Sequence, residues 1–171
     1  MKKAFVFILF LLIPISVTAQ TPDLILESGV GPHREIDAVY ASFTKAYREL
    51  NVDLVINLYT ADANYLAPGN PMSDGREKIR QGFAGFFEQV RKNGQTMEIK
   101  FRILSREVDQ KLGYDVGIYT INTFKDGKQI GQGQGKFFVV TKKIGEKWFF
   151  RFDAYSDLKP EKKEPPTGTT K

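Results

Sequence analysis

Cysteine is absent from the 171-residue chain, and histidine occurs once, as His33. Without cysteine the chain has no disulfide framework, thiolate zinc site, iron–sulfur cluster or cysteine nucleophile. A single histidine also excludes any site that needs two imidazoles, such as the HExxH metalloproteases. Because His33 stands without a partner at the start of a predicted helix, we expect it to be solvated. We therefore predict neither a metal site nor a cofactor.

Basic residues outnumber acidic ones, but the excess is concentrated at the two ends of the chain. The net charge is +5, of which Lys2 and Lys3 supply two, and residues 159–171 carry four Lys against two Glu. Residues 20–158 contain 19 basic and 18 acidic side chains. A nearly neutral central region offers no basic face, so we predict no nucleic-acid partner.

The first 19 residues are typical of a signal peptide. Lys2 and Lys3 precede an uncharged, mostly apolar run, and small residues surround the expected cleavage site after Ala19. The run is short for a membrane span and is interrupted by Pro14, which favours cleavage over an uncleaved membrane anchor. We therefore predict export of the protein, to the periplasm or outside the cell, with no stable membrane anchor.

The remaining chain divides by composition into three parts. Residues 20–32 form a leader, whose apolar residues 24–26 are expected to dock on the domain. Residues 33–158 contain the periodic apolar patterns of one folded domain. Residues 159–171 are charged and rich in proline and lack an apolar anchor, so we expect a disordered tail.

Helical patterns come first in the domain. Apolar side chains recur at three- and four-residue steps over 33–50 and over 79–90. Asn51 can cap a short helix between these two. Asp74 and Glu77 are spaced as in a capping box at the start of the last helix.

The pattern then changes to strands. Four runs are expected as strands, and Asp126-Gly127 predicts a tight hairpin turn between the second and third. These runs are 97–103, 114–124, 129–143 and 147–156, after a short strand at 64–67. Gly131, Gly133 and Gly135 share one strand face, which indicates a bend or a close approach of another backbone. The order predicts an α+β fold, with three N-terminal helices packed in a strongly curved, mostly antiparallel sheet.

Two segments carry a family resemblance, over about residues 33–157. LYTADANYLAPGNPMSDGREKI (58–79) follows the pattern lYtdDA…pG…G.e.I, and GEKWFFRFDAYS (145–156) resembles a closing strand. Both are similar to the nuclear-transport-factor-2-like superfamily, in its SnoaL-like and ketosteroid-isomerase-like branches. The resemblance implies a cone, in which a bent sheet wraps three helices around a deep pocket.

Steroid isomerase chemistry is not expected from this resemblance. Isomerases of this kind use an Asp base and an oxyanion hole built from a Tyr and a protonated Asp. The alignment places Ala67 at the general base, Phe43 at the oxyanion tyrosine and Phe83 at a supporting tyrosine. Because none of these side chains can exchange a proton, we do not expect that mechanism.

An aromatic pocket is the remaining prediction, although each aromatic taken singly also fits an ordinary core. Alternation along 147–156 assigns Phe152 to the interior, and Asp153 and Tyr155 to the outer face. The predicted pocket residues are Tyr40, Phe43, Tyr47, Tyr59, Tyr65, Met72, Phe83, Phe87, Tyr119, Phe137, Trp148, Phe150 and Phe152.

These observations favour an exported, non-catalytic module that binds a small apolar or aromatic molecule. One alternative is an enzyme of the isomerase, dehydratase or hydrolase type that uses Asp62, Asp153 or a pocket tyrosine. A second alternative is a dimerising interaction domain with a filled pocket and no ligand. Aromatic residues on the outer strand face, Phe149 and Tyr155 among them, together with the resemblance, predict a homodimer formed through the sheet.

Overall fold

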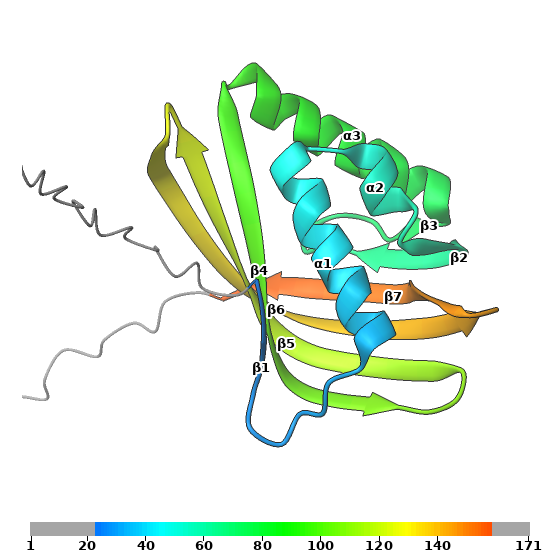
Figure 1. Cartoon of the computed structure of the whole chain (residues 1–171). Helices are drawn as coiled ribbons and strands as arrows, with labels where there is room; N and C mark the ends of the chain where they lie inside the picture. The colour runs from blue at the N-terminus through cyan, green and yellow to red at the C-terminus, as the bar shows by residue number, and fades with distance from the viewer. Residues whose placement is uncertain (1–22, 159–171) are drawn as a thin grey trace, which may run out of the picture.

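Three helices lie on the concave side of one curved, mixed sheet in the computed structural model, which describes residues 23–158 (Figure 1). The α+β architecture predicted from the sequence is therefore confirmed. The expected signal peptide and the expected disordered tail lie outside the described residues. Within residues 23–158, no helix is long and apolar enough to span a membrane.

The residue His33 precedes the first helix, α1 (Arg34–Glu49), and is its N-cap. His33 is half-buried rather than solvated, which corrects the expectation from the sequence. Its Nδ1 accepts a hydrogen bond from the backbone N–H of Ile36 at 3.3 Å, as an N-cap does. Its ring packs edge-on against Trp148, with the two ring centroids 5.2 Å apart. The histidine thus fixes the start of α1 on the sheet.

The other two helices begin differently. As predicted, the side chain of Asn51 caps α2 (Val52–Ile56), with its Oδ1 3.1 Å from the backbone nitrogen of Leu54. The predicted capping box of α3 (Arg76–Lys92) is wrong, because α3 begins at Gly75 with φ of 88° and no side-chain cap. Asp74 instead accepts a hydrogen bond from the Asn64 side chain at 3.0 Å, which joins the two short strands before α3.

Seven strands form the sheet, in the order β1-β4-β5-β6-β7-β2-β3. Consecutive strands from β4 to β7 pair antiparallel, whereas β1 is parallel to β4 and β2 is parallel to β7. Their bounds are β1 (Leu24–Leu26), β2 (Tyr59–Leu66), β3 (Ser73–Asp74), β4 (Gln95–Val108), β5 (Leu112–Lys125), β6 (Lys128–Ile144) and β7 (Lys147–Asp157). The leader residues 24–26 dock as β1, and the expected hairpin turn joins β5 to β6 at Asp126 (φ 51°) and Gly127 (φ 73°).

Two glycines let aromatic rings lie flat over the strands on the concave face. A Cβ on Gly135 would stand 2.3 Å from the ring of its cross-strand partner Tyr119. A Cβ on Gly117 would stand 2.6 Å from the ring of Phe137, its partner on β6. The close approach indicated by the glycine pattern is therefore real at Gly135, but a side chain makes it rather than a backbone.

A buried ion cluster ties α1 to the sheet. The guanidinium of Arg106, whose side chain is 3% exposed, bonds both oxygens of Asp115 at 2.7 and 2.9 Å. It also bonds Asp37 of α1 at 2.6 Å. These hydrogen bonds compensate the cost of burying the charges, and they set how α1 lies across β4 and β5.

Candidate functional site

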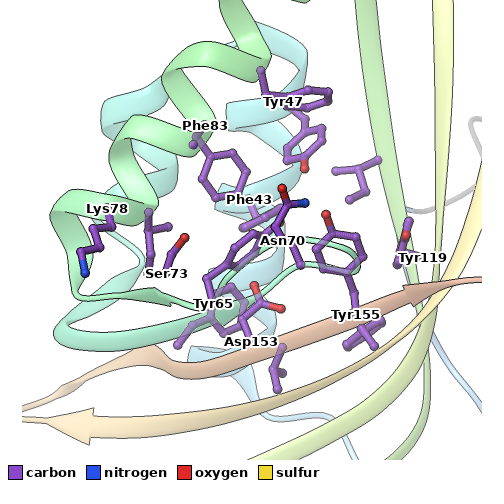
Figure 2. Close-up of a pocket in the computed structure, with 18 of the residues that line it drawn as sticks. Phe43, Tyr47, Tyr65, Asn70, Ser73, Lys78, Phe83, Tyr119, Asp153 and Tyr155 are labelled. Atoms are coloured by element: carbon purple, nitrogen blue, oxygen red, sulfur yellow. The ribbon is translucent and has the colours of Figure 1, made fainter.

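A cavity of about 790 Å³ lies between the helices and the concave face of the sheet (Figure 2). Its walls come from α1, α3 and the strands, and the loop 67–72 between β2 and β3 contributes Ala67, Asn70 and Met72. The helices and the curved sheet bury their aromatic faces against each other deeper in the domain. The cavity is the space that this packing leaves unfilled.

Nine of the thirteen predicted pocket residues line this cavity. They come from both helices, from the strands and from the loop: Tyr40, Phe43, Tyr47, Tyr65, Met72, Phe83, Tyr119, Phe137 and Phe150. Phe43, Phe83 and Ala67 stand where the resemblance places acid–base groups, so these parts of the wall carry no proton-exchanging group.

Four predicted pocket residues lie elsewhere. Phe87 and Trp148 are buried in the hydrophobic core, where Phe87 packs on Phe83 and Trp148 packs on His33. Tyr59 is fully buried behind the cavity wall. Phe152 is 40% exposed on the outer face of the sheet, so its assignment to the interior is wrong.

A β-bulge in β7 explains the error at Phe152. Val140 of β6 pairs with Phe152, but the next residue, Thr141, pairs with Phe150. Arg151 is therefore an extra residue that has no partner on β6, and the inward–outward alternation is reset after it. As a result Asp153 and Tyr155, which alternation had assigned to the outer face, line the cavity.

The carboxyl group of Asp153 is the chemically unusual feature of the wall. The residue is 7% exposed, and its Oδ2 accepts a hydrogen bond from the hydroxyl of Tyr59 at 2.5 Å. Burial raises the pKa of Asp153 to about 6, although the Tyr59 hydrogen bond opposes the increase. Burial, together with the nearby charge of Asp153, raises the pKa of Tyr59 well above its ordinary value. The dyad thus combines a carboxyl that titrates near neutrality with a phenol that stays protonated.

Tyrosine rings surround this carboxyl. Tyr65 lies opposite Asp153 on β2, and its ring is 5.6 Å from that of Tyr155. The Tyr155 ring is in turn 5.8 Å from that of Tyr119. Figure 2 shows the Asp153 carboxyl between Tyr65 and Tyr155, while Lys78 projects at the left edge of the view. Among the described residues, Asp153 and Lys78 are the charged members of the wall, and Lys78 is exposed.

The second candidate acid, Asp62, is not part of the cavity. Its side chain is 65% exposed and forms an ion pair with Arg151, with Nε and Oδ2 3.3 Å apart. The same arginine lies over the ring of Phe152, with its guanidinium carbon 4.3 Å from the ring centroid. Asp62 therefore belongs to a polar cluster on the outer surface. Within residues 23–158, no three acidic or histidine side chains group as metal ligands.

Some wall residues were missed by the sequence analysis. Phe101 and Ile99 alternate with Lys100, so their inward direction was present in the pattern. Phe86 belongs to the apolar pattern of α3 but is 40% exposed at its edge, and Asn70 lies in a turn, where no periodic pattern gives a direction. Tyr155 was assigned to the wrong face because of the bulge at Arg151.

Comparison with known proteins identifies the domain. A model of the SnoaL-like domain matches residues 36–155. Among curated proteins, none matches the chain significantly. Among solved structures, one from Xanthomonas campestris, named for a calcium/calmodulin dependent protein kinase II association domain, is 24% identical with a TM-score of 0.63. That match covers 78% of this chain and 92% of the other.

Two further structures share the fold at lower identity. A ketosteroid isomerase-like protein from Erwinia carotovora atroseptica is 15% identical with a TM-score of 0.60, covering 74% of this chain and 96% of the other. An NTF2-like protein with a cystatin-like fold from Novosphingobium aromaticivorans is 13% identical with a TM-score of 0.63, covering 73% and 80%. These neighbours share the architecture of the domain, and because the SnoaL-like match spans most of it, the chain belongs to the SnoaL-like domain family.

Proposed function

We propose that this protein binds a small apolar or aromatic molecule in the cavity between α1, α3 and the sheet. The observation that carries the proposal is the cavity itself, about 790 Å³ in volume and walled mainly by aromatic and other apolar side chains. This volume falls in the range of about 300–1,000 Å³ that is typical of small-molecule sites. An interaction domain with a filled pocket would leave no such space, so the cavity favours a ligand.

A variant that blocks the cavity tests this proposal. Ala67 is half-buried on the cavity wall, so Ala67→Trp places an indole at the loop without removing a core side chain. Ala61, which is exposed on β2, the strand that leads into this loop, supplies the matched control Ala61→Trp. Native mass spectrometry of the purified protein and a calorimetric screen of aromatic and lipid-like compounds should detect a ligand in wild type and control, and lose it in Ala67→Trp. Equal binding by all three proteins would contradict the proposal.

An isomerase-type enzyme is the second candidate, and the Asp153–Tyr59 pair is the observation that favours it. A carboxyl with a pKa of about 6 exchanges protons readily at neutral pH, and it lies on the wall of the cavity. Asp153 would then move a proton to or from a bound molecule. Turnover of a bound compound that is lost in Asp153→Asn would support catalysis, whereas unchanged recovery of the bound compound would support binding alone.

Self-association through the sheet is part of the same proposal. Phe138, 44% exposed, and Phe152 lie on the outer face of the sheet. Their half-buried neighbours on this face follow from the strand pairing: Val116 pairs with Phe138, and Val140 pairs with both Tyr114 and Phe152. An apolar patch of this kind is typical of a protein interface. We expect a homodimer of the exported chain in light scattering after size exclusion, and a monomer for Phe138→Ser; a monomeric wild type would contradict this.

A further inference from the structure

The Asp153 carboxyl carries an inference about the chemistry of the ligand. In the described part of the chain no Lys or Arg forms an ion pair with it, and its hydrogen bond comes from a neutral phenol, Tyr59. One of its oxygens, Oδ1, has no hydrogen-bond partner among the described residues. Carboxylates that are buried in proteins are usually paired with a cation or several donors. Asp153 instead faces a cavity, so a molecule in the cavity can supply the missing partner.

The surrounding rings suit a cation as well. Tyr65 and Tyr155 flank the carboxyl, and Tyr119 continues the same wall. The faces of aromatic rings carry partial negative charge and attract ammonium groups, and this attraction strengthens when water is excluded. Two independent attractions, one from the buried carboxylate and one from the faces of the aromatic rings, therefore favour a positively charged group at this position.

We propose that the ligand of this cavity carries a protonated amine on an apolar or aromatic body, and that the amine binds Asp153 between the rings of Tyr65 and Tyr155. This inference rests on the proposed function, because it specifies what the same cavity binds. Phe43, Phe83 and Phe150 would contact the apolar body, since they form the adjoining walls.

The other charges near the cavity do not offer a comparable site. Lys78 is exposed and lies at the left edge of the view in Figure 2, away from Asp153, so it does not hold an anion beside the carboxyl. Beyond Tyr40, the charge of Asp115 is already paired with Arg106. A ligand carboxylate placed deep in the cavity would meet Asp153 without a compensating cation, and would be repelled.

Of the ionisable groups on the deep wall of the cavity, Asp153 is the one that changes its charge near neutral pH, because the groups that face it are tyrosines. From β2 they are Tyr59 and Tyr65, and from β7 Tyr155, whose hydroxyls all have a raised pKa because of burial. Tyr47 of α1 and Tyr119 of β5 behave in the same way. Asp157, which accepts a hydrogen bond from Tyr119 at 3.4 Å, is an exposed carboxylate at the end of β7. Amine affinity should therefore follow the ionisation of Asp153.

Three naphthalene probes of matched shape test the inference: 2-naphthylmethylamine, 2-naphthylmethanol and 2-naphthoate. Isothermal titration calorimetry on the wild-type chain should show tightest binding for the amine. From about pH 7.5 to about pH 5 its affinity should fall about tenfold, because Asp153 becomes protonated while the probe keeps its charge. The affinity for the neutral alcohol should change by less than about threefold over the same range.

Asp153→Asn should weaken the affinity for the amine about tenfold or more, which corresponds to the loss of a hydrogen bond to a charged group. The affinity for the alcohol should stay within about threefold of the wild-type value. Asp62→Asn, which removes an exposed carboxylate outside the cavity, is the matched control and should change neither affinity. The pH series on the wild-type chain tests the role of the Asp153 charge in amine binding without any substitution.

The possible outcomes separate the inference from the proposed function. If the alcohol or the naphthoate binds wild type as tightly as the amine, or if affinity rises as pH falls, the amine inference is overturned while ligand binding stands. If none of the three probes binds wild type although native mass spectrometry shows a ligand that Ala67→Trp loses, the amine inference is overturned and the proposed function stands; if neither is seen, both are overturned.

Discussion

Replacing Asp153 by asparagine should stabilise the domain, and by an amount that depends on pH. The substitution keeps a carbonyl oxygen that can accept the hydrogen bond of the Tyr59 hydroxyl. It removes only the possibility of a negative charge in a buried position. The variant therefore isolates the free energy of holding the Asp153 carboxylate inside the domain.

The magnitude follows from the raised pKa of Asp153. Between the ordinary value of 3.8 and the folded value of about 6, each pKa unit represents about 1.4 kcal/mol, which gives about 3 kcal/mol in all. Because the folded state binds the proton more tightly, the contribution of Asp153 to the stability of the wild-type domain is fully present below about pH 4 and is lost as the pH rises through about 6. The free energy of unfolding of Asp153→Asn, relative to wild type, should therefore rise between these values and stay level above them.

Urea unfolding followed by circular dichroism, at intervals from about pH 4 to about pH 8, measures this difference. Subtracting the wild-type curve from that of the variant removes the titration of all other groups that the two proteins share. Asp62→Asn is the control, and its difference should stay within about 1 kcal/mol because that carboxylate is exposed. A difference between Asp153→Asn and wild type that does not change with pH would refute the raised pKa.

Two further substitutions test how the fold holds the cavity wall and α1 in place. Gly135→Val should lower the free energy of unfolding by about 1–3 kcal/mol and displace Tyr119 from the wall, because the new Cβ would lie 2.3 Å from its ring. Gly133→Val, at a position with nothing within 4 Å, is the control in the same urea assay. Arg106→Met should cost about 3–5 kcal/mol because it leaves Asp115 buried without a partner. The double variant Arg106→Met, Asp115→Leu should recover most of this loss, and a double variant as unstable as the single one would contradict this explanation.

Local chemistry allowed much of the fold to be predicted from the sequence. The Asn51 cap and the Asp126-Gly127 turn depend on a few adjacent residues, and the long strands alternate along their own length. Such signals do not require knowledge of the tertiary structure. The capping box at Asp74 failed although its spacing was correct, because Gly75 adopts a positive φ and Asp74 is used by Asn64 instead.

The site was less predictable because aromatic residues serve as core and as cavity wall with the same chemistry. Phe83 and Phe87 lie one helical turn apart on α3, yet one lines the cavity and the other is wholly in the core. The difference is set by the tertiary structure around each ring, which no local pattern in the sequence shows.

The bulge at Arg151 connects the chemistry of the cavity with the outer surface. Without the extra residue, strict alternation would bring Phe152 into the cavity and carry Asp153 to the outer face, as the sequence suggested. The cavity would then have a continuous apolar wall beside Tyr65, and it would favour neutral ligands only. With the bulge, a carboxyl meets Tyr59 inside the domain, while Phe152 moves outward beneath Arg151. One inserted residue therefore changes both the polarity of the cavity and the apolar area offered to a second copy of the chain.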